Sequence, residues 1–589
     1  MGFPLPSPRT ACRKDAVLQR CFETIPGILL WSTFLGLFIF SFVRPVWVAI
    51  FIITYDLYWL IRVSYFSIFM LIAYRKVRTE SETKWRERCE KVCADPTKYR
   101  REIERRLAEM EQSPKQNKRA IRSLRSHLQE LSRIASEKID VWDWKTIYHV
   151  VIFPTYREDL AILRSSLTAL LKSDFPVDRL IVVLAFEERE GLSAYGKARE
   201  LEVEFGASFG GLLTTFHPDG IPGEARVKGA NTSWAARRVK ELLDQRQIPY
   251  ERVILSSFDA DTCVDPQYFG CLTYNYIINP ERTRRSYQPL PMYHNNIWDA
   301  PSFARVVANS TSFWHMVQSI RPDLLITFSS HAMCFKTLME VGYWPVDVIS
   351  DDSVIFYCCY VYYEGKYETV PLYVPVSMDA NLAESYWRTF VNQYKQMRRW
   401  AWGVEKFPLM MRGFLAERKI PLSKKVKHVF RLLEGNYSWA TASFVIAIFG
   451  WLPLWVGGNA FNRTVLAYNL PSTTRSILTM ALVGVLISVF LCHALLPPRP
   501  ARYSRWRTVS MTLQWALVPF SYMVLVGLPA VDAQTRLMLG RYLAFWVTEK
   551  KRKTAPPLEY SGLKEKRALP RMGKMARGAS LQVKRKKAG

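Results

Sequence analysis

The chain has 589 residues, a formal net charge of +29 and a hydrophobic fraction of 49%. Charge and apolarity at these levels rarely spread evenly over one soluble domain, so they predict apolar spans joined by basic connections. Nucleic acid is excluded as a partner, because the basic residues flank apolar stretches and no zinc-finger, homeodomain or RNP-type motif occurs. The ten cysteines show no zinc-ribbon spacing, and we expect them all to be reduced.

The N-terminal part predicts a cytoplasmic terminus and two membrane helices. Residues 1–24 are polar and basic, whereas the apolar stretch Ile25–Val43 is followed at once by a second, Val46–Tyr74. The first stretch has no small-residue cleavage site, so we predict spanning helices and not a signal peptide. Asp56 and Arg62 lie in the second stretch; a position near the membrane interface or facing neighbouring helices is favoured over a functional role for them.

Residues 75–145 are dense in charge and form an insert between the spans and the next domain. Apolar residues recur at helical spacing in "YRREIERRLAEMEQ" and "KRAIRSLRSHLQELSRIASEKI", with "SPKQNK" between them. This pattern predicts a helical hairpin. Its face is either a partner surface or a solvated insert, and we favour the solvated insert.

Residues 146–380 change to an alternation of short β-branched runs and helical segments. The runs are "HVVIFPTY", "LIVVLAF" and "RVILSSFDADT". Such alternation predicts an α/β fold with a mostly parallel sheet flanked by helices. In that class ligands bind at the carboxyl ends of the strands.

The C-terminal part is again membrane-like. We expect interfacial helices over 381–436 and a membrane region over 437–530, with apolar stretches at Trp439–Val456, Ile477–Leu496 and Val509–Val526. The basic loop "PPRPARYSRWR" predicts a cytoplasmic connection. Residues 531–550 form a separate segment, and the very basic tail 551–589 is expected to be disordered and close to anionic lipid.

Two acidic motifs follow apolar runs in the α/β domain. Asp259 and Asp261 come directly after the strand-like "RVILSS", and two carboxylates one residue apart can bind one hard cation that neutralises a diphosphate. Asp351 and Asp352 follow "EVGYWPVDVIS", where one acid could act as a general base. The alternative for this second pair is a helix N-terminus, at which acids complement the helix dipole.

The stretch "QYKQMRRWAWG" carries a third motif, Q-x-x-R-W, at Gln396, Arg399 and Trp400. At helical spacing these side chains share one face. Arginine can bind phosphate oxygens bidentately, and tryptophan offers a plane on which a sugar ring can stack. The alternative is an aromatic–arginine helix at the membrane surface, and we keep that interpretation for Trp402 and Arg398.

In this order, with apolar spans on both sides, the motifs resemble those of the membrane-integrated family 2 glycosyltransferases, the class of cellulose, chitin and hyaluronan synthases. The family's acid triplet corresponds to "SDD" at 350–352, and "FWVTEK" at 545–550 resembles the F-x-V-T-x-K gating loop of bacterial cellulose synthases. "FPTYREDL" is similar to the family's first strand, and "KGANTSWA" to its K-x-x-x-N segment. The resemblance covers roughly residues 146–410 and, more loosely, the membrane region.

The resemblance implies a GT-A-type domain with a role for each matched residue. Asp259 and Asp261 would hold Mg²⁺ or Mn²⁺ and the donor diphosphate, and Asp352 would be the base that deprotonates the acceptor hydroxyl. The remaining implied residues fall into three groups: for the donor, Glu158, Glu187, Lys228, Gln396, Arg399, Thr548 and Lys550; for the acceptor, Trp400, Asp351 and His331; for gating, Phe545, Val547, Thr548 and Lys550.

This chain departs from the family pattern in two places. His331, in "SSHAMCFK", stands near the position of the family's usual asparagine, which alters acceptor or metal contacts. The tail is also too short for the cyclic-dinucleotide-binding domain that follows the gating loop in bacterial cellulose synthases.

Topology is constrained by the charge distribution. Three full C-terminal spans would put the basic tail outside the cell, against the positive-inside rule. Because Pro519 and Pro529 interrupt the last apolar stretch, we expect four spans and one re-entrant or interfacial segment, in the plasma membrane, with the active site facing the cytoplasm.

The resulting expectation is an inverting, metal-dependent glycosyltransferase that uses a nucleotide sugar, with a UDP-sugar favoured. Its acceptor is a glycan or a lipid, and its surroundings are membrane lipids. Processive synthesis and export of a β-linked polysaccharide is favoured over a single transfer to a membrane lipid. A non-catalytic membrane scaffold is the alternative of another class. Protein partners are not specified by the sequence.

Overall fold

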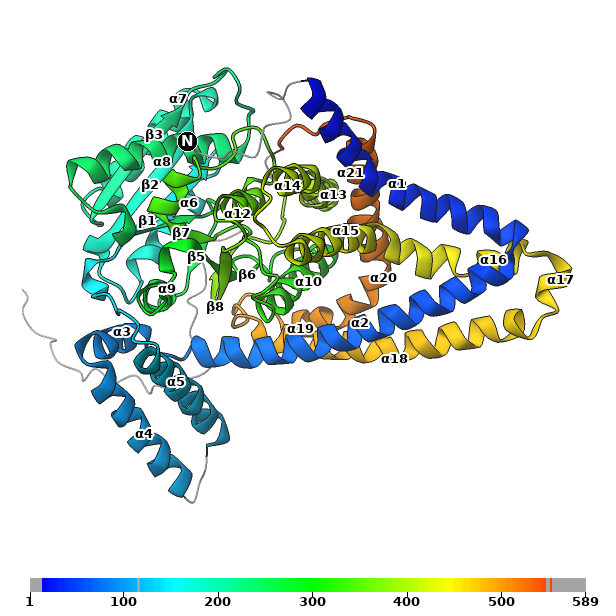
Figure 1. Cartoon of the computed structure of the whole chain (residues 1–589), viewed down its shortest axis with the longest axis horizontal. Coiled ribbons are helices and arrows are strands. Elements are labelled where there is room, and N and C mark those ends of the chain that lie inside the picture. Colours follow the sequence, from blue (N-terminus) through cyan, green and yellow to red (C-terminus); the bar gives the residue numbers. More distant parts are fainter. Residues whose placement is uncertain (1–12, 114–116, 547–550, 553–589) are drawn as a thin grey trace, which may run out of the picture. The chain divides into compact units, whose positions relative to one another are not determined.

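The computed structural model describes residues 13–113, 117–546 and 551–552. Within them the α/β part is built on one eight-stranded sheet with the order β3-β2-β1-β4-β7-β6-β8-β5 (Figure 1). The strands are β1 (Tyr148–Thr155), β2 (Leu180–Glu187), β3 (Gly211–His217), β4 (Val253–Ser257), β5 (Cys263–Val264), β6 (Arg285–Met292), β7 (Ala332–Cys334) and β8 (Glu368–Ser377).

The first half of this sheet is parallel, as its sequence predicts. β1 pairs in parallel with β2 and β4, and β2 pairs in parallel with β3. β7 then runs antiparallel to β4 and β6, while β6 and β8 are parallel. β2 is buried along its whole length, which is typical of a parallel strand covered on both faces and explains its unbroken apolar run. The predicted α/β, GT-A-type class with a mostly parallel sheet is confirmed.

Helices cover both faces of the sheet. They are α6 (Leu160–Leu171), α7 (Leu192–Phe205), α8 (Lys228–Gln245), α9 (Tyr268–Ile277), α10 (Ser302–Ser319), α11 (Phe335–Glu340) and α12 (Asp351–Tyr362). Short 3₁₀ turns lie next to the strands in the connecting segments: η1 (Trp144–Thr146), η2 (Val177–Arg179), η3 (Glu188–Glu190), η4 (Tyr250–Arg252) and η5 (Arg282–Arg284).

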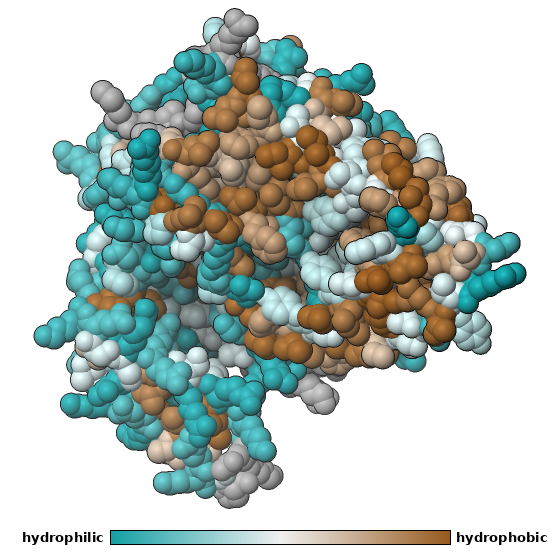
Figure 2. Space-filling view, turned by 45° about the vertical axis from the view of Figure 1, so that its right-hand side comes forward, coloured by the Kyte–Doolittle hydropathy of each residue, from teal (hydrophilic) through white to brown (hydrophobic). Residues whose placement is uncertain are grey.

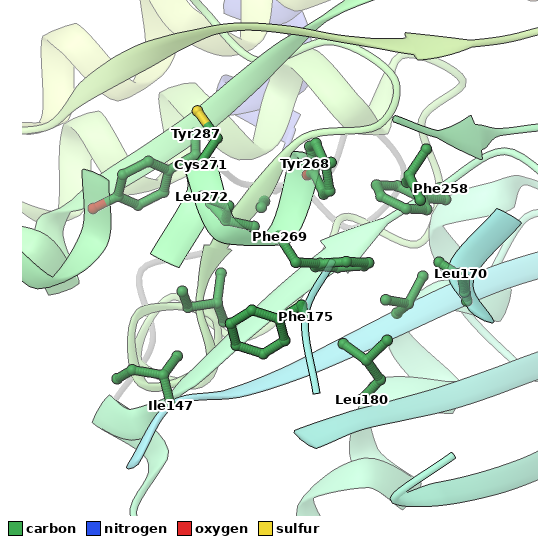
Figure 3. Close-up of a cluster of buried hydrophobic side chains, with 14 of the residues drawn as sticks. Ile147, Leu170, Phe175, Leu180, Phe258, Tyr268, Phe269, Cys271, Leu272 and Tyr287 are labelled. Carbon is green, nitrogen blue, oxygen red and sulfur yellow. The ribbon is translucent and has the colours of Figure 1, made fainter. Parts of the chain in front are cut away.

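An aromatic cluster fills one side of the sheet, where Phe175 lies beside Phe269 and Leu180 (Figure 3). The two phenylalanine rings are 6.3 Å apart between centroids. Burial of side chains of this size is the main favourable term in folding. The cluster stabilises the sheet, and Asp259 and Asp261 follow its strand β4.

The insert contains three helices, one more than predicted. They are α3 (Trp85–Ala94), α4 (Pro96–Gln112) and α5 (Lys118–Ser136), and α4 and α5 form the expected hairpin. α3 was missed because five of its ten residues are charged; its buried side chains are Trp85, Cys89 and Val92, and the helix packs on α9. Most of the insert surface is polar, and α5 also docks on the α/β part through Glu130, which accepts from the Tyr274 hydroxyl at 2.8 Å.

Among the described residues, five helical segments are long and apolar enough to cross a membrane: Lys14–Val43, Pro45–Glu80, Leu422–Val456, Val465–Leu495 and Arg505–Met538. They comprise α1 (Arg13–Val43), α2 (Pro45–Glu80), α15 (Leu422–Phe444), η7 (Val445–Phe449), α16 (Leu452–Val456), α18 (Val465–Leu495), α19 (Arg505–Leu513), η8 (Gln514–Leu517), α20 (Val518–Phe520), η9 (Ser521–Gly527) and α21 (Leu528–Met538), with α17 (Gly458–Asn462) in the turn before α18. Exposed apolar side chains gather in a broad patch on one face (Figure 2). Phe38 and Ile39 of α1 and Leu486 of α18 are among the exposed ones.

The charged residues of α2 face protein, as the favoured interpretation had it. Asp56 is buried and accepts from the Thr474 hydroxyl on α18 at 3.0 Å. Arg62 forms an ion pair with Glu434 on α15 and donates to the Ser438 hydroxyl at 3.2 Å. These contacts tie α2 to two neighbouring helices, because a charge inside an apolar bundle is stabilised only by a partner.

The fifth segment is a broken helix. η9 is a π-helical turn between Pro519 and Pro529, and each proline removes a backbone donor from the helical ladder. Near its start Arg507 donates to the Trp298 carbonyl at 2.7 Å, and near its end Asp532 accepts from Arg398 at 3.0 Å. The start of the segment therefore contacts the α/β part at Trp298, and its end contacts Arg398 in the helix that follows the α/β part.

Candidate active site

The site begins at the carboxyl end of β4, where the chain leaves the sheet at Asp259. Lys228 is the first residue of α8, and its ammonium donates to Asp259 Oδ1 at 2.8 Å and to the two oxygens of Asp352 at 3.2 and 3.0 Å. Burial lowers the pKa of Lys228, but Asp259 and Asp352 outweigh burial and raise it above its ordinary value. One lysine thus joins the two acidic motifs that the sequence placed 93 residues apart.

Close backbone approach makes this contact possible. Gly229 follows the lysine, and a Cβ atom there would lie 2.3 Å from the Pro345 carbonyl oxygen and 2.9 Å from the Asp351 Cβ. Real Cβ atoms essentially never approach so closely, so only glycine lets α8 begin against the loop that enters α12.

Asp352 is the exposed member of its pair and Asp351 the buried one. Asp351 is 3% exposed, and its pKa is raised well above its usual range by burial and then by the neighbouring Asp352 carboxylate. Both residues lie in the first turn of α12, where acids complement the helix dipole. The helix-terminus alternative is therefore correct and compatible with Asp352 facing the site. The Asp351 side chain packs on Gly229, and its contact with an acceptor stays a prediction.

His331 lies behind Asp352 and not on an open surface. Its ring is fully buried, its Nδ1 donates to the Phe328 carbonyl at 2.9 Å, and the same atom is 3.6 Å from Asp352 Oδ1. Burial lowers the pKa of the ring, which keeps it neutral. The ring therefore lies against the Asp352 carboxylate, and direct contact of His331 with an acceptor stays a prediction.

Asp261 connects the D-x-D motif to the chain after β8. Its Oδ2 accepts from the backbone N–H of Asp379 at 2.7 Å. The Asn295 amide bridges the Asp261 carbonyl and the Asp379 carboxylate, both at 2.9 Å. Asp379 also receives Arg552, whose guanidinium lies 2.7 Å from Oδ1. The segment after the gating-like motif is thereby attached beside the D-x-D acids.

The Q-x-x-R-W residues come from α13 (Tyr386–Ala401). Gln396 and Trp400 line one pocket, together with Tyr293, Val307, Ala308, Asp379, Ala380, Asn381 and Gln393. The Trp400 and Tyr293 rings are 6.2 Å apart between centroids. The Asn381 amide is 3% exposed, and neither of its polar atoms has a partner among the described residues. Aromatic walls with such amides suit a hydroxyl-rich ligand.

Arg399 points to the segment that follows the membrane region. Its guanidinium carbon lies 5.2 Å from the centre of the Phe545 ring, a cation–π contact. Its Nε is buried and has no hydrogen-bond partner among the described residues. A buried donor of this kind calls for an acceptor, and a phosphate oxygen would supply one. Of the predicted gating residues, Val547, Thr548 and Lys550 lie outside the described residues.

Two further predicted donor contacts sit elsewhere on the same sheet edge. Glu158 follows β1, where its Oε2 accepts from the Tyr156 N–H at 2.5 Å, and Glu187 ends β2 in an ion pair with Arg189. Burial raises the pKa of Glu187. Neither carboxylate contacts Lys228 in the part of the chain that the structure describes.

The carboxylates fit a shared cation site better than an all-protein one. The described residues contain no group of three or more histidine, cysteine or acidic side chains arranged to hold a metal. Mg²⁺ commonly uses only one or two carboxylates and completes its shell with water and substrate phosphates. Asp259 and Asp261 offer that donor set, all hard oxygens, so they could hold Mg²⁺ or Mn²⁺ when a diphosphate is present.

Sequence reasoning missed several neighbours of the site. Ser329 donates to Asp259 Oδ2 at 2.8 Å, and Asp379, Asn295 and Tyr293 complete the surroundings described above. Asp379 had a usable signal, since an acid directly after a buried strand is also what singled out Asp259. The interfacial interpretation does not fit Trp402, which is 1% exposed. For Arg398, which is paired with Asp532, it stays a prediction.

Comparisons with known proteins add a fold-level likeness only. No family model matches the sequence, and no curated protein matches it. Among solved structures the chain is similar to the mannosyltransferase PcManGT from Pyrobaculum calidifontis in complex with GDP-Man and Mn²⁺, with 16% identity over 74% of this chain and 99% of that chain and a TM-score of 0.34. For S. aureus TarS 1–349 in complex with UDP-GlcNAc the values are 12%, 70%, 99% and 0.31.

A third similar structure is GalNAc-T7 with UDP, GalNAc and Mn²⁺, at 11% identity over 51% of this chain and 58% of that chain, with a TM-score of 0.28. Identities and TM-scores this low do not carry an activity from one protein to another. The functional assignment therefore rests on the residues of this chain.

Proposed function

We propose that the protein is a membrane-integrated, metal-dependent glycosyltransferase that transfers a sugar from a nucleotide donor on the cytoplasmic side. The observation that carries this proposal is the contact of Lys228 with both Asp259 and Asp352. The contact brings Asp259, one of the two proposed cation ligands, next to Asp352, the proposed base. Both lie near the carboxyl ends of parallel strands, where such folds bind ligands. The order of the motifs along the chain supports the same assignment.

Each residue then has one task in a single displacement. Asp352 accepts the proton of the acceptor hydroxyl, whose oxygen forms a bond to the anomeric carbon as the bond to the nucleoside diphosphate breaks. Lys228 and Arg399 place positive charge where the leaving diphosphate gains negative charge. A cation held by Asp259 and Asp261 would neutralise further charge on that leaving group. Attack from the opposite face inverts the anomeric configuration.

Trp400 and Gln396 line one pocket, in which Trp400 would face the acceptor and Gln396 the donor diphosphate. Their pocket reaches Asp379, whose backbone N–H is bonded to Asp261, so acceptor and donor would meet beside the D-x-D acids. We favour a processive enzyme that passes a β-linked polysaccharide through its membrane region, on the strength of the Q-x-x-R-W motif. A single transfer to a lipid uses the same chemistry.

The test is incubation of the purified protein with a panel of UDP- and GDP-sugars in the presence of Mg²⁺ or Mn²⁺. Release of nucleoside diphosphate names the donor, and the size of the labelled product separates a polymer from a glycolipid. If none of the nucleotide sugars in the panel is consumed, the proposal is contradicted. A product with one added sugar would contradict processivity.

Trp400→Ala should lower sugar transfer by at least about 100-fold, because the acceptor would lose the plane that aligns it with the anomeric carbon. Binding of the nucleoside diphosphate should change by less than about threefold, since Trp400 lies on the acceptor side. Trp387→Ala is the matched control, because Trp387 is on the same helix but 69% exposed. Equal loss in both variants would mean that the tryptophan only anchors α13 at the membrane.

We also propose four complete spans and a fifth, broken segment that does not cross. Two observations support it: Arg507 and Asp532, near the two ends of this segment, both contact parts of the protein on the side of the α/β domain. The segment packs along α10 and α13 between these points, and Ser521, Leu525 and Gly527 of its π-helical turn are buried. Irregular backbone covered by protein is tolerated at membrane depth.

Cysteine labelling of intact cells checks this topology. Ser504→Cys before the segment and Leu539→Cys after it should react with an impermeant maleimide only after permeabilisation, whereas Asn459→Cys in the turn before α18 should react from outside. Leu539 is 57% exposed, so a lack of reaction at that site would not come from burial. Labelling of Leu539→Cys in intact cells would show that the fifth segment crosses the membrane.

A further inference from the structure

The turn after Q-x-x-R-W carries a glutamate that reaches the loop bearing the acids. This turn is η6 (Trp402–Glu405), followed directly by α14 (Lys406–Ala416). Glu405 Oε1 accepts from the backbone N–H groups of Ile349 at 2.8 Å and Ser350 at 2.7 Å. Its Oε2 accepts from the indole Nε1 of Trp402 at 2.8 Å. Three donors therefore converge on one carboxylate.

The two backbone donors immediately precede the acidic pair. Ser350 is the N-cap of α12, and its side chain forms no capping hydrogen bond, so Glu405 is what holds the peptide that enters this helix. The next residue, Lys406, donates to the Ser353 hydroxyl on the first turn of α12 at 3.2 Å. Glu405 and Lys406 thus bind the start of α12 on both sides of Asp352, at Ser350 and at Ser353.

The surroundings of this contact are closed. Trp402 is 1% exposed, and burial raises the pKa of Glu405 to about 7, against the lowering effect of its hydrogen bonds. Burial also lowers the pKa of Lys406 to about 8, with Arg431 acting in the same direction. A buried carboxylate with several donors is rigidly oriented, because loss of any one donor–acceptor pair leaves a polar group unsatisfied.

We propose that Glu405 is a positioning residue that holds Asp352 in a fixed relation to Trp400 and Arg399; this rests on the proposed function. Trp400 and Glu405 belong to one continuous helical run. The hydrogen bonds of Glu405 to Ile349 and Ser350 therefore connect the helix that carries Trp400 to the loop that leads to Asp352. A general base acts only within hydrogen-bond reach of its proton, and a displacement of about 1 Å can cost about 100-fold in rate. Glu405 should therefore set kcat and leave donor binding nearly unchanged.

Four variants test this role with the nucleotide sugar that the unsubstituted protein hydrolyses or transfers fastest. Glu405→Ala should lower kcat by about 10- to 100-fold and shift the KM for the donor by less than about threefold. Glu405→Gln should also lower kcat, because its NH₂ group faces the Trp402 indole N–H while its oxygen still accepts from Ile349 and Ser350. Combining it with Trp402→Phe removes that clash of donors and should restore kcat to within about threefold of Trp402→Phe alone.

Unchanged kcat in Glu405→Ala, or a double variant no faster than Glu405→Gln, would overturn the proposal. A role in folding alone would not produce that recovery. Hydrogen exchange of the peptides covering 345–352 provides a readout that needs no turnover. Faster exchange in Glu405→Ala, but not in Trp402→Phe, supports the proposal that Glu405 holds this loop. Unchanged exchange in Glu405→Ala rejects it. If no donor is turned over by the unsubstituted protein, the proposed function fails while the exchange result still decides whether Glu405 holds the acid loop.

Discussion

Asp352→Asn should abolish sugar transfer, with a loss of about 1,000-fold or more, and leave nucleotide binding within about threefold. Asparagine has almost the shape of aspartate and still accepts a hydrogen bond from Lys228, which now lies 3.0 Å from Oδ2. It cannot take up the proton of the acceptor hydroxyl. The measurement is single-turnover transfer of labelled sugar, with the dissociation constant of the nucleoside diphosphate determined in parallel.

Asp323→Asn provides the control for the loss of one carboxylate. Asp323 is paired with Lys427 on the surface and its side chain is 48% exposed, so this variant should transfer sugar at the rate of the unsubstituted protein. Transfer by Asp352→Asn at a similar rate would remove Asp352 from the role of base. It would favour the scaffold interpretation if Asp259→Asn were equally without effect.

Asp259→Asn and Asp261→Asn should weaken metal-dependent nucleotide binding by about 100-fold each, and with it lower transfer. The reason is electrostatic: the two carboxylates are the hard oxygen ligands nearest the expected diphosphate, and Asp259 also contacts Lys228 and Ser329. Titration of the nucleoside diphosphate with and without Mg²⁺ measures the effect. If both variants bind the nucleoside diphosphate with Mg²⁺ as strongly as the unsubstituted protein does, no cation is held between these residues.

Asp265→Asn is the matched control for this pair. Asp265 lies on the same segment, and its Oδ1 accepts from the Gln267 N–H at 2.9 Å, a bond that an asparagine oxygen also makes. Metal-dependent binding should persist in this variant. Together with Asp352→Asn, the substitutions separate binding of the donor from the chemical step.

The parts of the fold that the sequence predicts are those with a local signal. β1, β2 and β4 are rich in apolar residues because both faces of a parallel sheet are covered, and the long apolar helices follow from composition alone. α3 lacked such a signal, since its buried face is only a few residues wide. α15 begins at Leu422, well before the predicted apolar stretch at Trp439–Val456. The prediction missed its first turns because they carry the lysines of "LSKKVKH" and are not apolar.

The site divides in the same way. Asp259, Asp352 and Trp400 stand in short motifs, so sequence reasoning could name them. The contact of Asp259 and Asp352 with Lys228 depends on tertiary packing, and so does the pocket that Trp400 lines. Glu405 could not be found from the sequence, because its partners lie 55 and 56 residues away. Asp379 is 118 residues from Asp261. Contacts of this range depend on how the elements pack, and no periodicity records them.

The most direct test of the account follows the donor by NMR in one sample of protein, Mg²⁺, acceptor and an α-configured nucleotide sugar. We predict that the donor's anomeric signal falls as nucleoside diphosphate appears, and that the new glycosidic linkage has the β configuration. Addition of a chelator should stop the reaction. A product that keeps the α configuration would contradict a single displacement assisted by Asp352, and an unconsumed donor across the whole panel would contradict glycosyl transfer itself.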